Sequence, residues 1–312
     1  MGKRVRKVKK IIFIDLFLLI LIGISIGSGY YWYNESIKNK NTNTNLTKEI
    51  SILNNEISKK NESISSLDKE IDTYSNLDKT ILDTRNNYYQ EIKKLEDDIL
   101  SGKSNKKIAY LTFDDGPYYN TYKVLNILDK YNVKATFFTT NTNGEYCYDK
   151  KSENCWKIYS EYAKRGHTIA NHTYTHAIFR GLYKSTASFI DAVNKQEAHV
   201  KKLTGGYVTN IVRFPGGSST AGKLKNSIIT ELRKKKYGWV DWSAQDGDGG
   251  ELSSIDEARS IFKSSIDSKI EVILFHDYNG YTTELLPEFI EYLTKNGYEM
   301  YPLFYESNMI NK

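Results

Sequence analysis

The first hundred residues contain no cysteine, histidine or proline, whereas all five histidines, all four prolines and both cysteines follow Lys107. Histidine is the side chain that most readily exchanges protons and binds metals at neutral pH, so this chemistry is confined to the later part of the chain. The 312 residues leave room for one catalytic domain and accessory segments. The sequence therefore predicts a leader followed by a chemical domain over residues 103–312.

The chain also lacks a concentrated positive surface outside its first ten residues. Its formal net charge is +6, and the basic residues within positions 1–10 alone supply six positive charges. Basic residues after Lys103 are spread along the chain rather than clustered in a stripe. This distribution argues against nucleic acid as a partner.

A long apolar run follows the basic N-terminus. Residues 11–29 are apolar except for Asp15 and two serines, and at about 1.5 Å per helical residue they span roughly a hydrocarbon core. The aromatic residues 30–33 would lie at the membrane interface, and the basic tail 1–10 is predicted to stay cytoplasmic. We therefore expect a single-pass transmembrane anchor over residues 11–33 of a bacterial membrane protein, with the rest extracellular. A cleaved secretory signal is the alternative, although no convincing small-x-small site precedes the aromatic residues.

A helical stalk is expected next. After a polar linker at 34–45, apolar residues recur at steps of three and four through residues 46–102, including Tyr88, Ile92, Leu95 and Ile99. This heptad spacing predicts a coiled coil and a homo-oligomer. The alternatives are one solvated helix, or a helix that folds back on the catalytic domain.

Short β-type runs alternate with amphipathic segments from Lys107 onward. Strands are predicted at 108–113, 135–139, 168–171, 211–214, 238–242, 272–276 and 298–303, and helices at 122–131, 187–203 and 255–266. Repeated strand and helix units indicate a parallel sheet, and we expect a distorted (β/α) barrel of about seven parallel strands. In such folds the site lies at the carboxyl ends of the strands.

Polar residues stand at two of these strand ends. Asp114 and Asp115 follow the first predicted strand, and neighbouring side chains of an extended chain diverge, so the two carboxylates are expected to do different jobs. His172 and His176 follow the third predicted strand, and their spacing would place both rings on one face of a helical turn. Two histidines and one carboxylate form a facial set with open positions, which is typical of a catalytic metal site.

These motifs resemble the polysaccharide deacetylases of carbohydrate esterase family four, the NodB-homology domain. The resemblance covers roughly residues 106–305 and rests on five motifs in order. They are T-F-D-D-G at 112–116, H-T-x-x-H at 172–176, R-x-P at 213–215, D-W at 241–242 and L-x-H at 274–276. Two positions depart from the pattern, because Gly238 and Gly216 stand where the family often has aspartate and tyrosine.

The resemblance also implies a role for each motif residue. It implies that Asp115, His172 and His176 bind a divalent metal, usually zinc, with cobalt or another transition metal as alternatives, and that Asp114 is the general base. The resemblance further implies that Arg213 orients Asp114, that His276 is the general acid and that Asp241 adjusts the pKa of His276. It implies that Trp242 forms one wall of the acetyl pocket and that the Gly216 N–H donates to the oxyanion. Pro215 and Leu274 are implied to line the substrate site.

Cys147 and Cys155 lie in a polar loop after the second predicted strand. Their spacing and an oxidising extracellular space favour a disulfide, with two free thiols as the alternative.

The sequence thus predicts an enzyme that removes N-acetyl groups from cell-wall glycan, with N-acetylglucosamine of peptidoglycan as its expected substrate. Alternatives are N-acetylmuramic acid, chitin or xylan. A third hypothesis is a membrane-tethered scaffold whose domain only binds glycan.

Overall fold

The computed structural model describes residues 17–18, 20–26, 28, 43–141, 153–204 and 209–311, with the side chains of 43–48, 67–84 and 153–156 excepted. The chain divides into two compact units, Met1–Arg85 and Asn86–Lys312. The predicted cytoplasmic tail, residues 34–42 of the predicted linker and most of the predicted anchor lie outside the described residues. The described residues of the anchor are helical, and residues 43–45 of the predicted linker are helical as well. Among the described residues, no helix has both the length and the apolar character that a membrane span needs.

Helix α2, Asn43–Leu100, is a single helix of 58 residues that contributes to both units. Whether its N-terminal part forms a coiled coil stays a prediction. Its last turns, however, belong to the catalytic unit, since Ile92 and Ile99 are buried in a core with Ile108 and Leu303. The compact unit begins at Asn86, and the division into a stalk over 46–102 and a deacetylase domain over 103–312 stays a prediction. Heptad spacing could not reveal that these last turns are buried, because it describes an apolar face and not the partner that covers the face.

One buried carboxylate fastens these last turns. Glu96 accepts hydrogen bonds from the Tyr110 hydroxyl, the Ser307 hydroxyl and the Asn308 backbone N–H. Burial raises the pKa of Glu96, against these hydrogen bonds, which lower it. The end of α2 is thus tied both to the first strand and to the C-terminal segment.

Within the described residues, eight strands form one sheet in the order β5-β4-β3-β2-β1-β7-β6, with β8 also paired to β1, and the pairings between these strands are all parallel. The strands are β1 (Lys107–Asp114), β2 (Thr136–Thr139), β3 (Thr168–Asn171), β4 (Ile211–Val212), β5 (Gly238–Trp239), β6 (Ala244–Gln245), β7 (Ile270–His276) and β8 (Tyr298–Tyr301). The predicted parallel α/β class is confirmed. The sheet is an open half-barrel with one more strand than expected. The additional strand is β6, whose residues Ala244 and Gln245 include only one apolar side chain and so leave no apolar run in the sequence.

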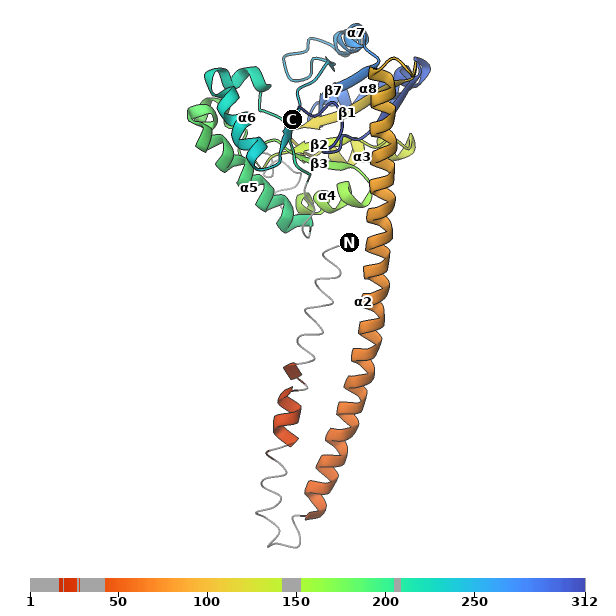
Figure 1. Ribbon diagram of the computed structural model, residues 1–312, viewed down its shortest axis with the longest axis vertical. Helices are drawn as coiled ribbons and strands as arrows, with labels where there is room; N and C mark the ends of the chain where they lie inside the picture. The colour runs from red at the N-terminus through yellow and green to blue at the C-terminus, as the bar shows by residue number, and fades with distance from the viewer. Residues whose placement is uncertain are drawn as a thin grey trace. The chain divides into compact units, whose positions relative to one another are not determined.

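Helices lie beside the sheet, and Figure 1 shows α5 and α6 packed next to one another and β1, β2, β3 and β7 side by side. The helices are α3 (Thr121–Lys130), α4 (Glu153–Lys164), α5 (Thr186–Thr204), α6 (Lys225–Lys234), α7 (Ile255–Ser265) and α8 (Gly280–Lys295), with 3-10 turns η2 (Ile178–Arg180), η3 (Leu182–Lys184) and η4 (Ser218–Leu224). The three predicted helices correspond to α3, α5 and α7 within a residue or so at each end.

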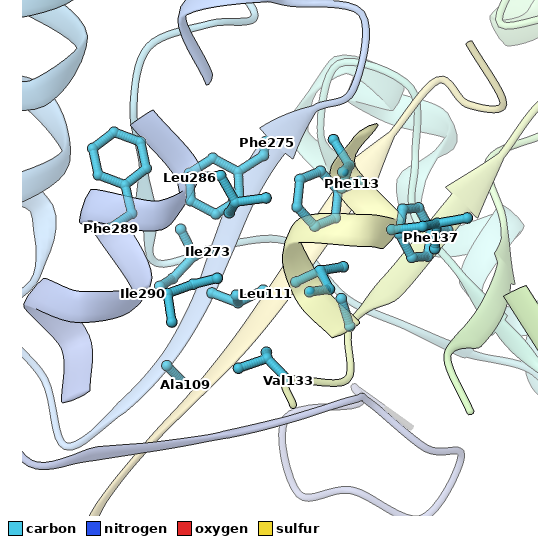
Figure 2. Packing of buried hydrophobic residues seen from close by; sticks show 14 of the residues in the cluster. Ala109, Leu111, Phe113, Val133, Phe137, Ile273, Phe275, Leu286, Phe289 and Ile290 are labelled. Atoms are coloured by element: carbon cyan, nitrogen blue, oxygen red, sulfur yellow. The ribbon is translucent and has the colours of Figure 1, made fainter. Parts of the chain in front are cut away.

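An aromatic core fixes the central strands (Figure 2). Phe113 of β1 stacks on Phe137 of β2, with ring centroids 5.1 Å apart, and lies 5.5 Å from Phe275 of β7. Interiors this densely packed resist displacement of one strand past another. The register therefore holds Asp114, the last residue of β1, beside His276, the last residue of β7.

Candidate active site

The two adjacent aspartates leave the end of β1 in different directions. Asp114 is still part of the strand and is buried, whereas Asp115 has left-handed backbone, with φ of 69°, and is partly exposed. This local turn, unusual for a residue other than glycine, brings the Asp115 carboxylate toward the loop after β3. The expectation that the two side chains diverge is confirmed.

His172 and His176 lie in a loop, so the predicted helical turn is wrong. Thr173 and His176 both have positive φ, 65° and 43°, and the Thr173 N–H donates to the Asn171 side-chain oxygen at 2.9 Å. The irregular backbone still brings the rings together, with centroids 4.9 Å apart. The spacing of His172 and His176 therefore predicted correctly that their rings meet, but it predicted the wrong backbone. A loop with left-handed residues can bring two side chains together as a helical turn does.

Asp115, His172 and His176 form a group whose ligand atoms all lie within 4.8 Å of one another. Asp115 Oδ1 is 3.6 Å from His172 Nε2 and 3.4 Å from His176 Nε2. Two atoms bound tetrahedrally at about 2.1 Å from one zinc ion lie roughly 3.4 Å apart, so the three side chains fit a single ion.

The surroundings of His172 also suit a metal ligand. Its Nδ1 lies 2.9 Å from the Arg213 carbonyl oxygen, a contact that holds the hydrogen on Nδ1 and leaves Nε2 as the electron donor. Burial lowers the pKa of His172 to about 3, with His176 adding to the effect. The ring is therefore neutral, as a metal ligand must be.

Arg213 secures Asp114, as expected for the third motif. Its Nη1 donates to Asp114 Oδ1 at 2.9 Å and to the Thr112 hydroxyl at 2.7 Å, and its guanidinium carbon lies 4.2 Å from the centre of the Phe138 ring. Burial raises the pKa of Asp114, against the charge of Arg213, which lowers it. One carboxylate oxygen is thus fixed, while Oδ2 lies 3.6 Å from His172 Nε2.

The partner of His276 is Asp248, not Asp241. Asp248 Oδ1 is 2.7 Å from His276 Nδ1, and Asp248 Oδ2 accepts from the His276 backbone N–H at 2.6 Å. Burial lowers the pKa of His276. The adjacent Asp248 carboxylate, together with Asp115 and Asp114, raises it by more, so that the pKa of His276 is about 10. The imidazole thus holds a proton that it can deliver from Nε2.

The short strand β6 explains why Asp248 and not Asp241 reaches His276. Pairing of Gln245 with Leu274 carries the chain that follows β6 to the end of β7. Asp241, before β6, instead accepts from the Ser218 backbone N–H at 2.9 Å and from the Ser218 hydroxyl at 2.5 Å. The available signal for Asp248 was the polar run at 245–249, which holds two aspartates after an apolar residue.

Asp246 completes the acidic support behind His276. The Thr282 hydroxyl lies 2.7 Å from both Asp246 Oδ2 and Asp248 Oδ2. Burial, together with the nearby Asp248, raises the pKa of Asp246 to about 8. Burial thus favours the protonated form of Asp246.

The remaining predicted site residues lie around this centre. Trp242 packs against the turn at Gly217, where an added Cβ would lie 3.2 Å from the indole ring. Leu274 is buried in β7. The Pro215 carbonyl accepts a hydrogen bond from the Tyr183 hydroxyl at 2.8 Å. Gly216 has φ of 72°. Contact of these four residues with substrate stays a prediction. Cys147 and the side chain of Cys155 lie outside the described residues, so the disulfide also stays a prediction.

Comparison with known proteins agrees with this geometry. Residues 101–234 match the family model described as polysaccharide deacetylase. A bifunctional xylanase/deacetylase from Pseudobutyrivibrio xylanivorans is 32% identical over 62% of this chain, which spans only 29% of that relative's length. A peptidoglycan-N-acetylglucosamine deacetylase from Bacillus cereus is 28% identical over 70% of this chain and 77% of the relative.

A solved structure is similar at the level of fold and sequence. The catalytic domain of peptidoglycan N-acetylglucosamine deacetylase from Eubacterium rectale has a TM-score of 0.59 and 32% identity, over 67% of this chain and 93% of that domain. From its motifs, its half-barrel and these relatives, the chain belongs to the polysaccharide deacetylases of carbohydrate esterase family four, a family of hydrolases.

Proposed function

We propose that the chain removes the acetyl group from N-acetylglucosamine residues of peptidoglycan, with zinc held by Asp115, His172 and His176. The observation that carries this proposal is the placement of a carboxylate, Asp114, and an imidazole, His276, at the ends of neighbouring strands beside the three ligand side chains. Amide hydrolysis needs a base for water and an acid for the departing amine, and this arrangement supplies both.

A bound divalent ion would polarise the acetyl oxygen and acidify water. Asp114 accepts at Oδ2 a proton of the water whose oxygen bonds to the acetyl carbon, because Oδ1 is engaged by Arg213. His276 delivers a proton from Nε2 to the amide nitrogen as the C–N bond breaks, while Nδ1 remains bonded to Asp248. His276 Nε2 is 3.9 Å from Asp115 Oδ2, so acid and ligand set face a common space that one acetamido group could occupy.

The choice of peptidoglycan rests on the named activities of two relatives and on the predicted anchor. Both the Bacillus cereus relative and the Eubacterium rectale domain carry the name peptidoglycan N-acetylglucosamine deacetylase. A single-pass anchor over residues 11–33 would hold the catalytic domain outside the cell, next to the wall. This localisation is tested by recovery of the full chain in the membrane fraction together with removal of the domain by protease added to intact cells.

A panel of glycans tests the reaction and the substrate. Purified protein with zinc is incubated with peptidoglycan, N-acetylglucosamine oligomers and acetylated xylan, and released acetate is measured, with product sugars identified after hydrolysis of the glycan. Glucosamine from peptidoglycan is the expected product. Deacetylated muramic acid in its place would move the substrate to the neighbouring sugar, and no acetate from any glycan would overturn the proposal.

Asp114→Asn is the matched control for this panel. The amide keeps the shape of the side chain but cannot take a proton, so acetate release is expected to fall at least a hundredfold. Metal content, measured after dialysis, is expected to stay near one ion per chain, because the ligands are untouched. Retained turnover would contradict the role given to Asp114.

A further inference from the structure

Two aspartates share one threonine hydroxyl behind His276. The Thr282 Oγ1 atom, on α8, lies 2.7 Å from Asp246 Oδ2 and 2.7 Å from Asp248 Oδ2. All three side chains are buried, and Asp246 Oδ1 accepts from the Asp248 backbone N–H at 3.2 Å. Gly247, with φ of 84°, turns the chain between the two aspartates. The hydroxyl therefore joins two carboxyl groups that are close to each other and shielded from water.

The number of hydrogen atoms available decides how this group is bonded. A threonine hydroxyl has one hydrogen and can donate it to only one carboxylate oxygen, and an ionised carboxylate can only accept. Two ionised aspartates would leave one buried oxygen 2.7 Å from a hydroxyl lone pair, with no hydrogen between them. Both contacts are hydrogen bonds only if one of the two carboxyl groups carries a proton and donates it to the hydroxyl oxygen.

The surroundings of the two aspartates decide which of them carries that proton. Asp248 Oδ1 lies 2.7 Å from His276 Nδ1, and Asp248 Oδ2 accepts from the His276 backbone N–H at 2.6 Å. A charged imidazole at this distance favours the ionised form of Asp248. The turn that carries Asp246 packs on an apolar side chain instead, since a Cβ added at Gly247 would lie 2.7 Å from Ile261. The raised pKa of Asp246 agrees with a proton on this side chain.

We propose that Asp246 is a positioning residue that stays protonated and donates through Thr282 to Asp248. The hydrogen bonds then run in one direction, from Asp246 Oδ2 to Thr282 Oγ1 and from Thr282 to Asp248 Oδ2. They hold Asp248 Oδ1 against His276 Nδ1. The inference rests on the proposed function, because it concerns the acid of that reaction, and it adds a neutral carboxyl group that fixes the partner of this acid.

Other titratable groups lie at and just after the ends of β7 and β1, around His276 and Asp248. They are His276 itself, Asp277, Tyr278, Asp114 and Asp115. The variants below leave these five groups unchanged, so a shift of the pH profile reports on the substituted side chain.

Asp246→Asn tests the protonation state. The amide is neutral, its oxygen can accept from the Asp248 N–H, and its nitrogen can donate to Thr282 as a carboxyl O–H would. The alkaline limb of the pH profile of kcat is therefore expected to stay within about 0.3 pH unit of the wild type. If Asp246 were ionised, the variant would remove a negative charge near His276 and move the limb to lower pH by about half a unit or more. That shift would overturn the proposal.

Thr282→Val tests the connection between the two aspartates. Valine has nearly the same shape but no hydroxyl, so Asp248 is held less firmly. We expect kcat to fall about tenfold and KM to change less than about twofold, since His276 gives up its proton only as the C–N bond breaks. Thr282→Ser supplies a hydroxyl again and should restore kcat. A Thr282→Val variant with the kcat of the wild type would contradict the connection.

Thr283→Val is the matched control. Thr283 is also buried on α8, but its hydroxyl donates to the Asn279 carbonyl oxygen at 2.9 Å. This variant loses a buried hydroxyl of the same helix and should keep the kcat of the wild type. A tenfold loss in Thr283→Val as well would assign the effect to the helix and overturn the role given to Thr282.

Infrared spectroscopy detects the proton without turnover. The difference spectrum between wild type and Asp246→Asn at pH 7 is expected to contain the C=O band of a protonated carboxyl group. Carboxylate bands in its place would show that Asp246 is ionised and would overturn the proposal. A wild type with no activity on any glycan would overturn the proposed function, and the infrared result would still distinguish the two forms of Asp246.

Discussion

The Asp248 carboxylate beside His276 should set the position of the alkaline limb of the pH–activity profile. Asp248 favours the protonated imidazole and so raises its pKa. In Asp248→Asn the hydrogen bond can persist but the negative charge is lost, so the pKa of His276 falls. Activity requires the protonated ring, so the alkaline limb of the pH profile of kcat is expected to move to lower pH by at least one unit.

Asp241→Asn is the control for this measurement, since Asp241 bonds to Ser218 and not to His276. This substitution should leave the alkaline limb in place, whatever its effect on turnover. An alkaline limb that moves in Asp241→Asn and stays fixed in Asp248→Asn would reverse the assignment.

A second histidine should make stability depend on pH. His167 is buried, its Nδ1 accepts from the Ala135 N–H at 3.1 Å, and burial lowers its pKa from 6.5 to about 3. Below pH 6.5 the unfolded chain binds a proton that the folded chain rejects, so stability is full above this pH and falls below it. The contribution lost between pH 6.5 and pH 5 is about 2 kcal/mol.

His167→Asn places an uncharged acceptor near the position of Nδ1, so this acid-side loss should disappear even if the variant is less stable at pH 7. Urea unfolding at pH 7 and pH 5 measures the difference. An equal pH dependence in wild type and variant would exclude His167 as the source.

At the scale of elements, the end of α2 is part of the catalytic unit. A chain that begins at Lys103 loses Ile92 and Ile99 from the core, where each buried side chain contributes about 1.5–3 kcal/mol. Its melting temperature is expected to fall by roughly 10 °C or more relative to a chain that begins at Asn86. Equal melting temperatures would show that these turns contribute little.

The strands differ in how clearly the sequence predicts them, and so do the site residues at their ends. Strands β1 and β7 were clear because seven buried residues in a row leave a long apolar signal, and Asp114 and His276 were found at their ends. Asp248 was assigned no role, because its place depends on β6, which has a single apolar residue and so leaves no apolar run in the sequence. The loop after β3 was predicted as a helical turn, because positive φ at Thr173 and His176 has no signature in residues that are not glycine.

At the scale of the molecule, a metal ion would join parts of the chain that are distant in sequence. Asp115 comes from the end of β1 and His172 and His176 from the loop after β3, so an ion bound only by the folded chain should stabilise the whole domain. With zinc at about a thousand times its Kd, the free energy of unfolding rises by about 4 kcal/mol, which corresponds to a rise in melting temperature of roughly 10 °C.

A chelator should reverse this rise in melting temperature and abolish acetate release, and added zinc should restore both. In His176→Ala the ligand set is broken, so neither zinc nor chelator should move the melting temperature much. A wild type that melts at one temperature with zinc and with chelator would contradict binding at these three side chains.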